Sequence, residues 1–557
     1  MKISIFILPI VLLLSPLASH AQAWKWAKSL GTPNNTTAVK NIRPYTGTSV
    51  LVGGSFAAPM LTLGSQTLNN AGQDDGFVAI ADDSGQYAWA AKIGGAGRDF
   101  VVDAAAAGNG DFIVVGNFNS ISLSIGGANL FNSGETDAFV VKYNQDKTLA
   151  WARKIGTADI DEVSAVVLDV NGNAYVSGQV VDKFTLQTLH VFLRKYDAAG
   201  SLVWEKKNTI QGSGILQAVA LTLDDNQRIY LGGSLSGTAV FDGINLVSSE
   251  WGSSAFIVKY NTSGALLDTT IQHELGKFNG LQAHDNYIYA CAEKMNYGIG
   301  WGWPLADSKI HVLKLDADLN TVWEKFAGGE QTAQSLDIAK SISVDDLGNA
   351  YVTGYFFSDT LHFAGQAVPN LFNVNYYYPQ IFVFKYAPSG EELWGKSLGG
   401  IHADEGTSIH AFGDDQFYLG GNFESNPVAF GAYELHNTGT LDSMYVHLRP
   451  GRYVRSTMGF LAVFDKNLSS IHPEPALQAV AIFPNPAAEH LTLRLTSPAQ
   501  SPITLYISTL DGRMLRQSEH SGQVVEIRQD LTGLAPGLYF VTLRTERGVF
   551  SGKFVKG

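Results

Sequence analysis

Four aspartates recur at one position of a repeated pattern, shortly after a tryptophan-centred segment: Asp99, Asp161, Asp337 and Asp404. Carboxylates at such positions can accept hydrogen bonds from sugar hydroxyls, and two of them roughly 5–10 Å apart in a cleft can cleave a polysaccharide by acid–base chemistry. A structural explanation is also open, because aspartate bonds backbone amides in its own loop. The sequence alone leaves ligand binding, catalysis and loop anchoring open for these aspartates.

Two loop segments are unusually rich in aromatic side chains, which can stack on sugar rings or surround a cationic group. Their candidate ligand-binding residues are Tyr297, Trp301, Trp303, Tyr376, Tyr377 and Tyr378. Beside the aspartates they would form a face that binds a glycan or a protein. The alternative is that these insertions pack over the edge of the fold and bind nothing.

No catalytic signature accompanies these residues. The sequence has no Gly-x-Ser-x-Gly, no His-Glu-x-x-His and no phosphate-binding glycine loop, and its 13 histidines are scattered. Clusters such as Asp169-Val-Asn-Gly172 resemble calcium loops but lack the glutamate that ends a twelve-residue site, so hairpin turns explain them better. No catalytic residue, metal site or cofactor is therefore predicted.

The composition excludes some partners and some chemistry. The net charge of −13 repels phosphate backbones, so nucleic acid is not an expected partner. The single cysteine, Cys291, cannot form an intramolecular disulfide, and its small neighbours predict a buried side chain rather than a nucleophile.

The elements that position the candidate residues come from a repeat. Three landmarks recur in fixed order in seven units: a tryptophan strand such as Trp151-Ala-Arg-Lys154, an aromatic-to-glycine strand such as Tyr175-Val-Ser-Gly178, and a strand such as Phe139-Val-Val-Lys-Tyr143. A fourth, weaker strand precedes the glycine landmark. Seven four-stranded units predict an all-β fold, a seven-bladed β-propeller. A straight solenoid is the alternative.

The two ends of the array favour a closed ring. The array starts with a lone tryptophan strand around Trp26 and ends near Asp465 with a unit that lacks one. Pairing the Trp26 strand beside Phe460–Phe464 would complete the last blade and remove two open sheet edges. Because strands alternate in direction, the loop after each tryptophan strand and the loop before each Phe-Val-x-Lys-Tyr strand open on one face, called here the candidate face.

The N-terminus is typical of a secretory signal peptide. Lys2 is followed by the apolar run Ile3–Leu14 and by small residues at Ala21 and Ala23, so cleavage is expected after Ala23 or, as the alternative, after Ala21. A membrane-anchoring helix is the other explanation, but the apolar run is shorter than the roughly 20 residues that span a bilayer. No transmembrane segment is expected after signal removal.

The repeat units, with Trp-x-Lys, Gly-Asn-x-Tyr-Val-x-Gly and Phe-Val-x-Lys-Tyr, resemble the SBBP-type β-propeller repeat of secreted bacterial proteins over about residues 24–465. That resemblance implies the propeller architecture and no single activity.

Beyond Asp465, Pro473 and Pro475 indicate a linker, and about seven short alternating strands follow. The motif residues of this segment are Pro484, Asn485, Pro486, Asp511, Gly512, Gly537, Tyr539, Lys553 and Lys556. Their order resembles the C-terminal sorting domain of type IX secretion substrates from Bacteroidetes. The resemblance implies that the type IX secretion machinery is a partner. An adhesive Ig-like module is the alternative.

These features predict a signal peptide (1–23), a seven-bladed β-propeller (24–465), a linker (466–480) and a sorting domain with a small Ig-like β-sandwich fold (481–557). We expect a non-enzymatic protein that is exported through the periplasm and is secreted or held at the outer cell surface, where it binds a glycan or a surface protein. The alternatives are a secreted polysaccharide-active hydrolase or lyase and a structural surface component.

Overall fold

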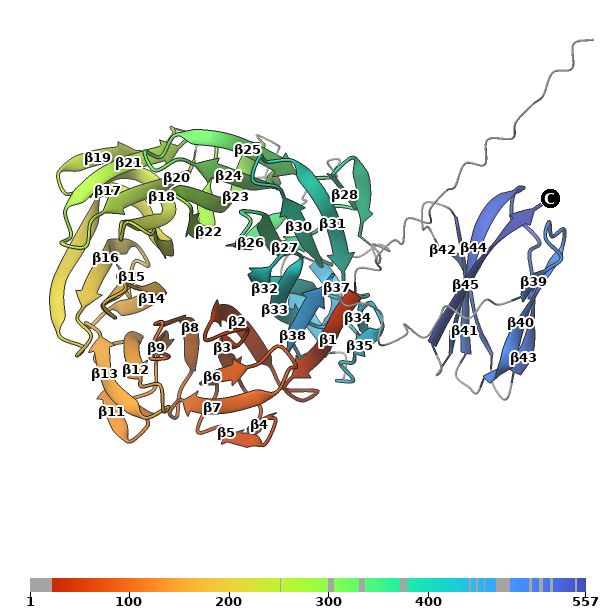
Figure 1. The fold of residues 1–557 in the computed structure, drawn as a ribbon, viewed down its shortest axis with the longest axis horizontal. Coiled ribbons are helices and arrows are strands. Elements are labelled where there is room, and N and C mark those ends of the chain that lie inside the picture. The colour runs from red at the N-terminus through yellow and green to blue at the C-terminus, as the bar shows by residue number, and fades with distance from the viewer. Residues whose placement is uncertain are drawn as a thin grey trace, which may run out of the picture.

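The structure is a computed structural model that describes residues 23–250, 252–298, 305–329, 336–370, 378–439, 442–446, 449–454, 456–466, 481–499, 503–509, 514–520, 524–545 and 548–557. Within these ranges the chain is built from β-strands and contains no helix. In Figure 1 the strands from β1 to β38 form a ring, and those from β39 to β45 form a separate sandwich. The predicted all-β propeller class is confirmed.

Seven units of four antiparallel strands make up the ring. The innermost strands are β2 (Thr37–Pro44), β8 (Asp99–Ala106), β14 (Ile160–Leu168), β17 (Leu202–Leu223), β22 (Lys277–His284), β26 (Ile338–Val344) and β32 (Asp404–Gly413). The second strands are β3 (Val50–Phe56), β9 (Phe112–Phe118), β15 (Ala174–Val181), β18 (Ile229–Phe241), β23 (Tyr287–Gly298), β27 (Ala350–Phe356) and β33 (Gln416–Phe423).

The third strands are β6 (Asp75–Ala81), β12 (Asp137–Tyr143), β16 (Thr188–Tyr196), β20 (Ser254–Tyr260), β24 (Leu305–Leu315), β30 (Gln380–Tyr386) and β38 (Met458–Asp465). The outer strands are β7 (Tyr87–Ile93), β13 (Leu149–Ile155), the first half of β17, β21 (Leu266–Gln272), β25 (Thr321–Ala327), β31 (Glu392–Leu398) and β1 (Ala23–Leu30). Strand β17 ends the third unit and begins the fourth, so these two units share one continuous sheet.

The ring is closed by the first strand of the chain. Strand β1 pairs antiparallel with β38, with Trp26 opposite Val463 and Ser29 opposite Phe460. The predicted closure is confirmed. It removes the free edge of β38, which would otherwise expose unpaired backbone groups.

The recurring tryptophan and lysine residues tie each unit to the next. The indole of Trp151 in the second unit donates to the carbonyl of Ala198 in the third at 3.1 Å. The indole of Trp204 in the third unit and the ammonium of Lys195 both donate to the carbonyl of Thr262 in the fourth. The repeat pattern therefore encodes contacts between blades.

The recurring tyrosine of the second strand anchors the turn before it. Tyr351 donates to the Asp345 carboxylate at 3.0 Å, and its oxygen accepts a hydrogen bond from the Asp415 amide of the next unit at 2.8 Å. Asp345 also accepts from the backbone of Leu347 and Asn349. The carboxylate thus shapes the turn from within, in line with the turn interpretation of the Asp-x-Asn-Gly clusters.

Tyr351→Phe is expected to lower the free energy of unfolding by about 1–3 kcal/mol, because it removes a donor from a buried carboxylate and an acceptor from a buried amide. Urea denaturation measures the effect. The matched control is Y386F, since the buried hydroxyl of Tyr386 has no hydrogen-bond partner among the described residues and its loss should be neutral or stabilising. Equal losses in both variants would contradict the anchoring role.

Small hairpins stand between the second and third strands of several units. They are β4 (Met60–Leu63) with β5 (Gln66–Asn69), β10 (Ser122–Ile125) with β11 (Ala128–Phe131), β28 (Thr360–Phe363) with β29 (Gln366–Pro369), and β34 (Val428–Phe430) with β35 (Tyr433–Leu435), while β19 (Ile244–Val247) extends β18 and β36 (Asp442–Val446) pairs with β37 (Arg449–Val454). Their apolar side chains, such as Leu361 and Phe363, are buried. Bridges such as Gly329 to Leu361 connect a hairpin to the preceding unit.

The C-terminal sandwich consists of two antiparallel sheets. One holds β39 (Ala481–Phe483), β40 (His490–Ala499) and β43 (Val524–Asp530), and the other holds β42 (Met514–His520), β41 (Ile503–Thr509), β44 (Gly537–Thr545) and β45 (Gly548–Lys556). Alternating residues such as Leu491, Leu505 and Val541 fill one shared core. The predicted sandwich is confirmed.

Candidate functional site

The two kinds of loop on the candidate face lie side by side. The backbone amide of Asp404, at the start of an innermost strand, donates to the carbonyl of Pro379 in the loop before a third strand, at 3.0 Å. Equivalent bonds join Asp99 to Asp74 and Asp161 to Thr136. The expectation that both loops open on one face is therefore confirmed.

The four predicted aspartates are all buried at the start of innermost strands. Asp404 accepts from the Gly400 amide at 2.8 Å and the Ser425 hydroxyl at 2.7 Å. Asp99 does the same with Gly95 and Ser120.

The other two aspartates are held in similar ways. Asp337 accepts from the Ser358 hydroxyl, and Asp161 accepts from the amide and hydroxyl of Thr157. The geometry of all four favours the loop-anchoring explanation over ligand contact.

Burial raises the pKa of three of these aspartates, Asp99, Asp337 and Asp404. Desolvation raises the pKa of Asp99 and of Asp337, although hydrogen bonds from serine oppose it. For Asp404 desolvation raises the pKa to about 7, with Glu424 adding to the rise. Asp404 therefore titrates near neutral pH.

Only part of the predicted aromatic set is described. Trp301, Trp303, Tyr376 and Tyr377 lie outside the described residues. Tyr297 lies in β23 opposite Ala306. Tyr378 is buried and packs edge-to-face against His402, with ring centroids 5.2 Å apart. Tyr378 therefore offers no exposed ring for stacking.

A pocket of about 270 Å³ opens between the sixth and seventh units, where the two loop types meet. We call it the interblade pocket. Its walls include Tyr355, Phe357, Glu405, Glu424 and Asn422. The Tyr355 and Phe357 rings pack edge-to-face 5.8 Å apart, and the Asn422 amide donates to Glu405 at 2.9 Å. The pocket thus combines aromatic surface with carboxylate acceptors.

A second cavity, of about 470 Å³, is the central channel, which is lined by the innermost strands of all seven units. Each of these strands carries a β-bulge at the same level. The extra residues of the bulges are Lys40, Val102, Ser164, Val219, Asn279, Lys340 and Thr407, and all seven line the channel. Bulges re-aim side chains, so this ring of residues sets the chemistry of the channel wall.

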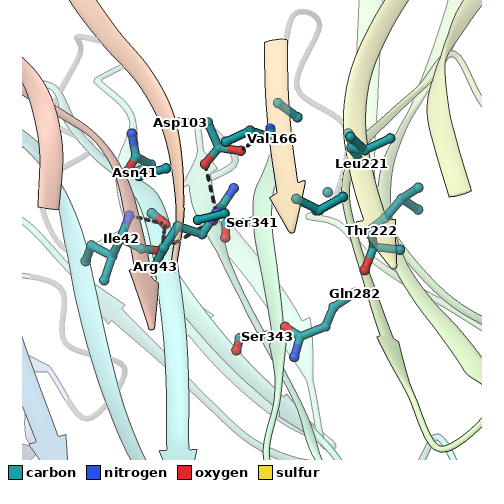
Figure 2. Close-up of a pocket in the computed structure, with 18 of the residues that line it drawn as sticks. Asn41, Ile42, Arg43, Asp103, Val166, Leu221, Thr222, Gln282, Ser341 and Ser343 are labelled. Atoms are coloured by element: carbon teal, nitrogen blue, oxygen red, sulfur yellow. Dashed lines mark hydrogen bonds and ion pairs between the residues drawn. The ribbon is translucent and has the colours of Figure 1, made fainter. Parts of the chain in front are cut away.

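Several polar groups of the channel satisfy backbone groups between units. Figure 2 shows the Arg43–Asp103 ion pair, with a distance of 2.8 Å, on one wall of the channel. Asp103 also accepts from the Val166 amide at 3.1 Å, and the Ser341 hydroxyl accepts from the Ile409 amide at 3.2 Å. These side chains cover the otherwise unpaired edges of the innermost strands.

The described residues contain no group of three or more His, Cys, Asp or Glu side chains arranged to hold a metal ion. Cys291 is fully buried, and desolvation raises the pKa of its thiol to about 12, so it is protonated at neutral pH. Among the described residues no helix is long and apolar enough to cross a membrane.

In the sandwich, the predicted sorting residues gather at the last strand. The side-chain oxygen of Asn485, between Pro484 and Pro486, accepts a hydrogen bond from the Val555 amide at 2.9 Å. Ala487, which follows this motif, exchanges backbone bonds with Val555 and Gly557.

The remaining sorting residues lie on the neighbouring strands. Gly537 begins β44 and is paired with Lys556 of β45, the strand that also carries Lys553. The Tyr539 ring stacks on Phe554 at 5.6 Å. Asp511 and Gly512 lie outside the described residues.

The sequence did not predict most of the residues that line the two cavities. Tyr355 and Phe357 follow a glycine landmark and read as ordinary strand residues, and Glu424 lies in the next unit. The channel residues Lys40 and Lys340 carry one available signal: each occupies the same offset within its repeat. Aligning the seven innermost strands by their bulges would have found them.

Two family models match parts of the chain. Residues 481–557 match the secretion system C-terminal sorting domain, and residues 328–355 match the beta-propeller repeat. An uncharacterized WD repeat-containing protein of Acanthamoeba polyphaga mimivirus is 20% identical over 459 residues, with 66% of this chain covered. The chain spans only 32% of that relative's length.

Solved structures show distant likeness. The phage phi92 endosialidase is 10% identical with a TM-score of 0.36, over 96% of this chain and 87% of that one. A protein of unknown function from Bacteroides thetaiotaomicron is 11% identical with a TM-score of 0.29, over 78% and 100%. A polysaccharide lyase is 11% identical with a TM-score of 0.30, over 58% and 74%.

At these scores no activity is carried over from the solved structures. The family matches and the observed topology are the basis for assignment, and the sorting domain indicates export to the medium or the cell surface. The chain therefore carries a secretion system C-terminal sorting domain at residues 481–557 and a match to the beta-propeller repeat within a ring of seven four-stranded units.

Proposed function

We propose that the protein is an exported, non-enzymatic binding protein that holds a glycan in the interblade pocket. The observation that carries the proposal is the meeting of Tyr355 and Phe357 with Glu405 and Glu424 in one pocket on the candidate face. Aromatic rings stack on the apolar faces of sugars, and carboxylates accept hydrogen bonds from hydroxyl groups. A surface protein that inserts a polar side chain is the second ligand class.

The precursor organisation is part of the same proposal. A signal peptide (1–23) directs the chain to the periplasm, the propeller (24–465) carries the ligand, and a linker (466–480) connects it to the sorting domain (481–557). The type IX secretion machinery recognises that last domain.

Tyr355→Ala and Phe357→Ala are each expected to weaken binding about tenfold or more, since a lost aromatic contact costs about 1.5–3 kcal/mol. A glycan array and a pull-down with insoluble polysaccharides, both with the full chain, identify the ligand, and titration calorimetry measures the change. The control is F184A, because Phe184 is 84% exposed and remote in sequence from the pocket. Binding that survives in both pocket variants would place the ligand elsewhere.

An enzymatic function is the second candidate, favoured by one observation. Asp404, with a pKa of about 7, lines the same pocket as Glu405 and Glu424. A carboxyl group that titrates near neutral pH is suited to acid–base chemistry. Release of reducing ends or of unsaturated products from a bound polysaccharide, abolished in E405Q and E424Q, would establish turnover and displace the non-enzymatic proposal.

A further inference from the structure

We propose that the central channel is an oxyanion-binding site in which Lys40 and Lys340 hold a carboxylate, sulfate or phosphate group. The two lysines are bulge residues of β2 and β26 and stand at the same level of the channel. The innermost strand of the seventh unit, β32, lies between them and carries Thr407 at that level. The Thr407 hydroxyl donates to the Val39 carbonyl, which ties β32 to β2 next to Lys40.

Among the described residues, carboxylates such as Glu405 and Glu293 act on Lys340 only through their charge, without an ion pair. Lys40 and Lys340 form no ion pair within the part of the chain that the structure describes, and Lys340 is half-buried, with its ammonium 5.2 Å from the Tyr355 ring centre. The Asp103 carboxylate that lines the channel is already paired with Arg43. A bound anion would therefore meet two available cations.

The protonation of Lys340 is consistent with this arrangement. Desolvation is the largest cause that lowers its pKa, and Lys277 and Lys40 lower it further, while Glu405 and Glu293 act in the opposite sense. An anion between Lys40 and Lys340 would relieve both the desolvation and the mutual repulsion of the two cations.

The uncharged bulge residues of the other units determine on which side of the channel an anion would bind. The bulge residues of the second to fourth units are Val102, Ser164 and Val219, which carry no charge, so the positive charge is confined to one side of the channel. The volume of about 470 Å³ is within the range of small-ligand sites. A basic wall within a protein of net charge −13 gives a local preference for anions.

Titration calorimetry on the full chain tests the site with three probes: sulfate ion, trigalacturonate and the neutral methyl ester of trigalacturonate. K40M and K340M are each expected to weaken binding of the charged probes by about tenfold or more, whereas K340R should retain it. The control is K207M, because Lys207 lies on the outer part of β17, 53% exposed beside Glu205.

Binding of sulfate together with trigalacturonate would identify a site for free anions, and binding of trigalacturonate alone would identify an acidic saccharide as the source of the oxyanion. Either binding pattern supports the site if the binding is lost in K40M and K340M. Unchanged affinity in both variants, or no binding of either charged probe, overturns it. Without anion, the unfolding midpoint of K340M should equal or exceed that of the unmodified chain, which separates lost binding from lost folding. Glycan binding in the interblade pocket is scored separately with F357A, because Y355A would also remove the ring beside the Lys340 ammonium.

Discussion

Trp24→Ala is expected to lower the free energy of unfolding of the propeller by about 3–5 kcal/mol, the range for large-to-small changes of buried aromatic residues. Trp24 is 7% exposed and lies in the closing strand β1. Its ring contacts Phe430 edge-to-face at 5.0 Å and Phe464 at 5.4 Å. The variant therefore leaves a cavity at the junction between the first strand and the last unit.

The position of Trp24 makes the effect larger than that of a similar cavity elsewhere. Strand β1 has β38 as its only sheet partner among the described strands, and its side chains bond the first unit, as Trp26 does to the Asp83 carbonyl, so side-chain packing helps to keep the ring closed. Urea denaturation followed by tryptophan fluorescence, with circular dichroism as a second probe, measures the loss. F184A is the control and should change stability by less than about 0.5 kcal/mol. A comparable change in the two variants would show that the closing strand contributes little.

Asp404→Asn is expected to remove a pH dependence from the stability of the seventh unit. The folded-state pKa of Asp404, about 7, lies above the usual value near 3.9 because the carboxyl group is desolvated. Between these pH values the folded protein keeps a proton that the unfolded chain has released. Stability contributed by this group therefore falls as pH rises from about 4 to about 7 and is constant above that.

The difference in unfolding free energy between the unmodified chain and D404N, measured by urea denaturation between about pH 4 and about pH 8, isolates this group. Its slope should approach about 1.4 kcal/mol per pH unit within the window, with D404N gaining relative stability as pH rises. S425A provides a second test, because loss of the Ser425 hydroxyl bond, 2.7 Å long, raises the pKa of Asp404 and moves the end of the window upward. If the stability difference from the unmodified chain does not depend on pH in either D404N or S425A, Asp404 does not titrate within this pH window.

The ligand-binding and loop-anchoring explanations of the recurrent aspartates were both open from the sequence, because one residue type serves both. For both Asp99 and Asp404, the sequence is compatible with a hydrogen bond to a ligand and with a hydrogen bond within the loop. Only the positions of Ser120 and Ser425, more than twenty residues downstream of Gly95 and Gly400, show that the carboxylates are occupied. The serine follows its aspartate by 21 residues in three units, but the spacing alone does not show that the two side chains bond.

The repeat, the ring closure through the Trp26 strand and the sorting motif were determined by the sequence alone. The physical reason is that each depends on local patterns: alternation within a strand, a tryptophan or lysine that reaches the next unit, and a missing outer strand that the first strand supplies. The cavities were decided by the tertiary structure. Lys40 and Lys340 belong to the first and sixth units, and Tyr355 and Glu424 to adjacent ones, so they meet only because closure of the ring and the seven bulges bring their strands together around one axis.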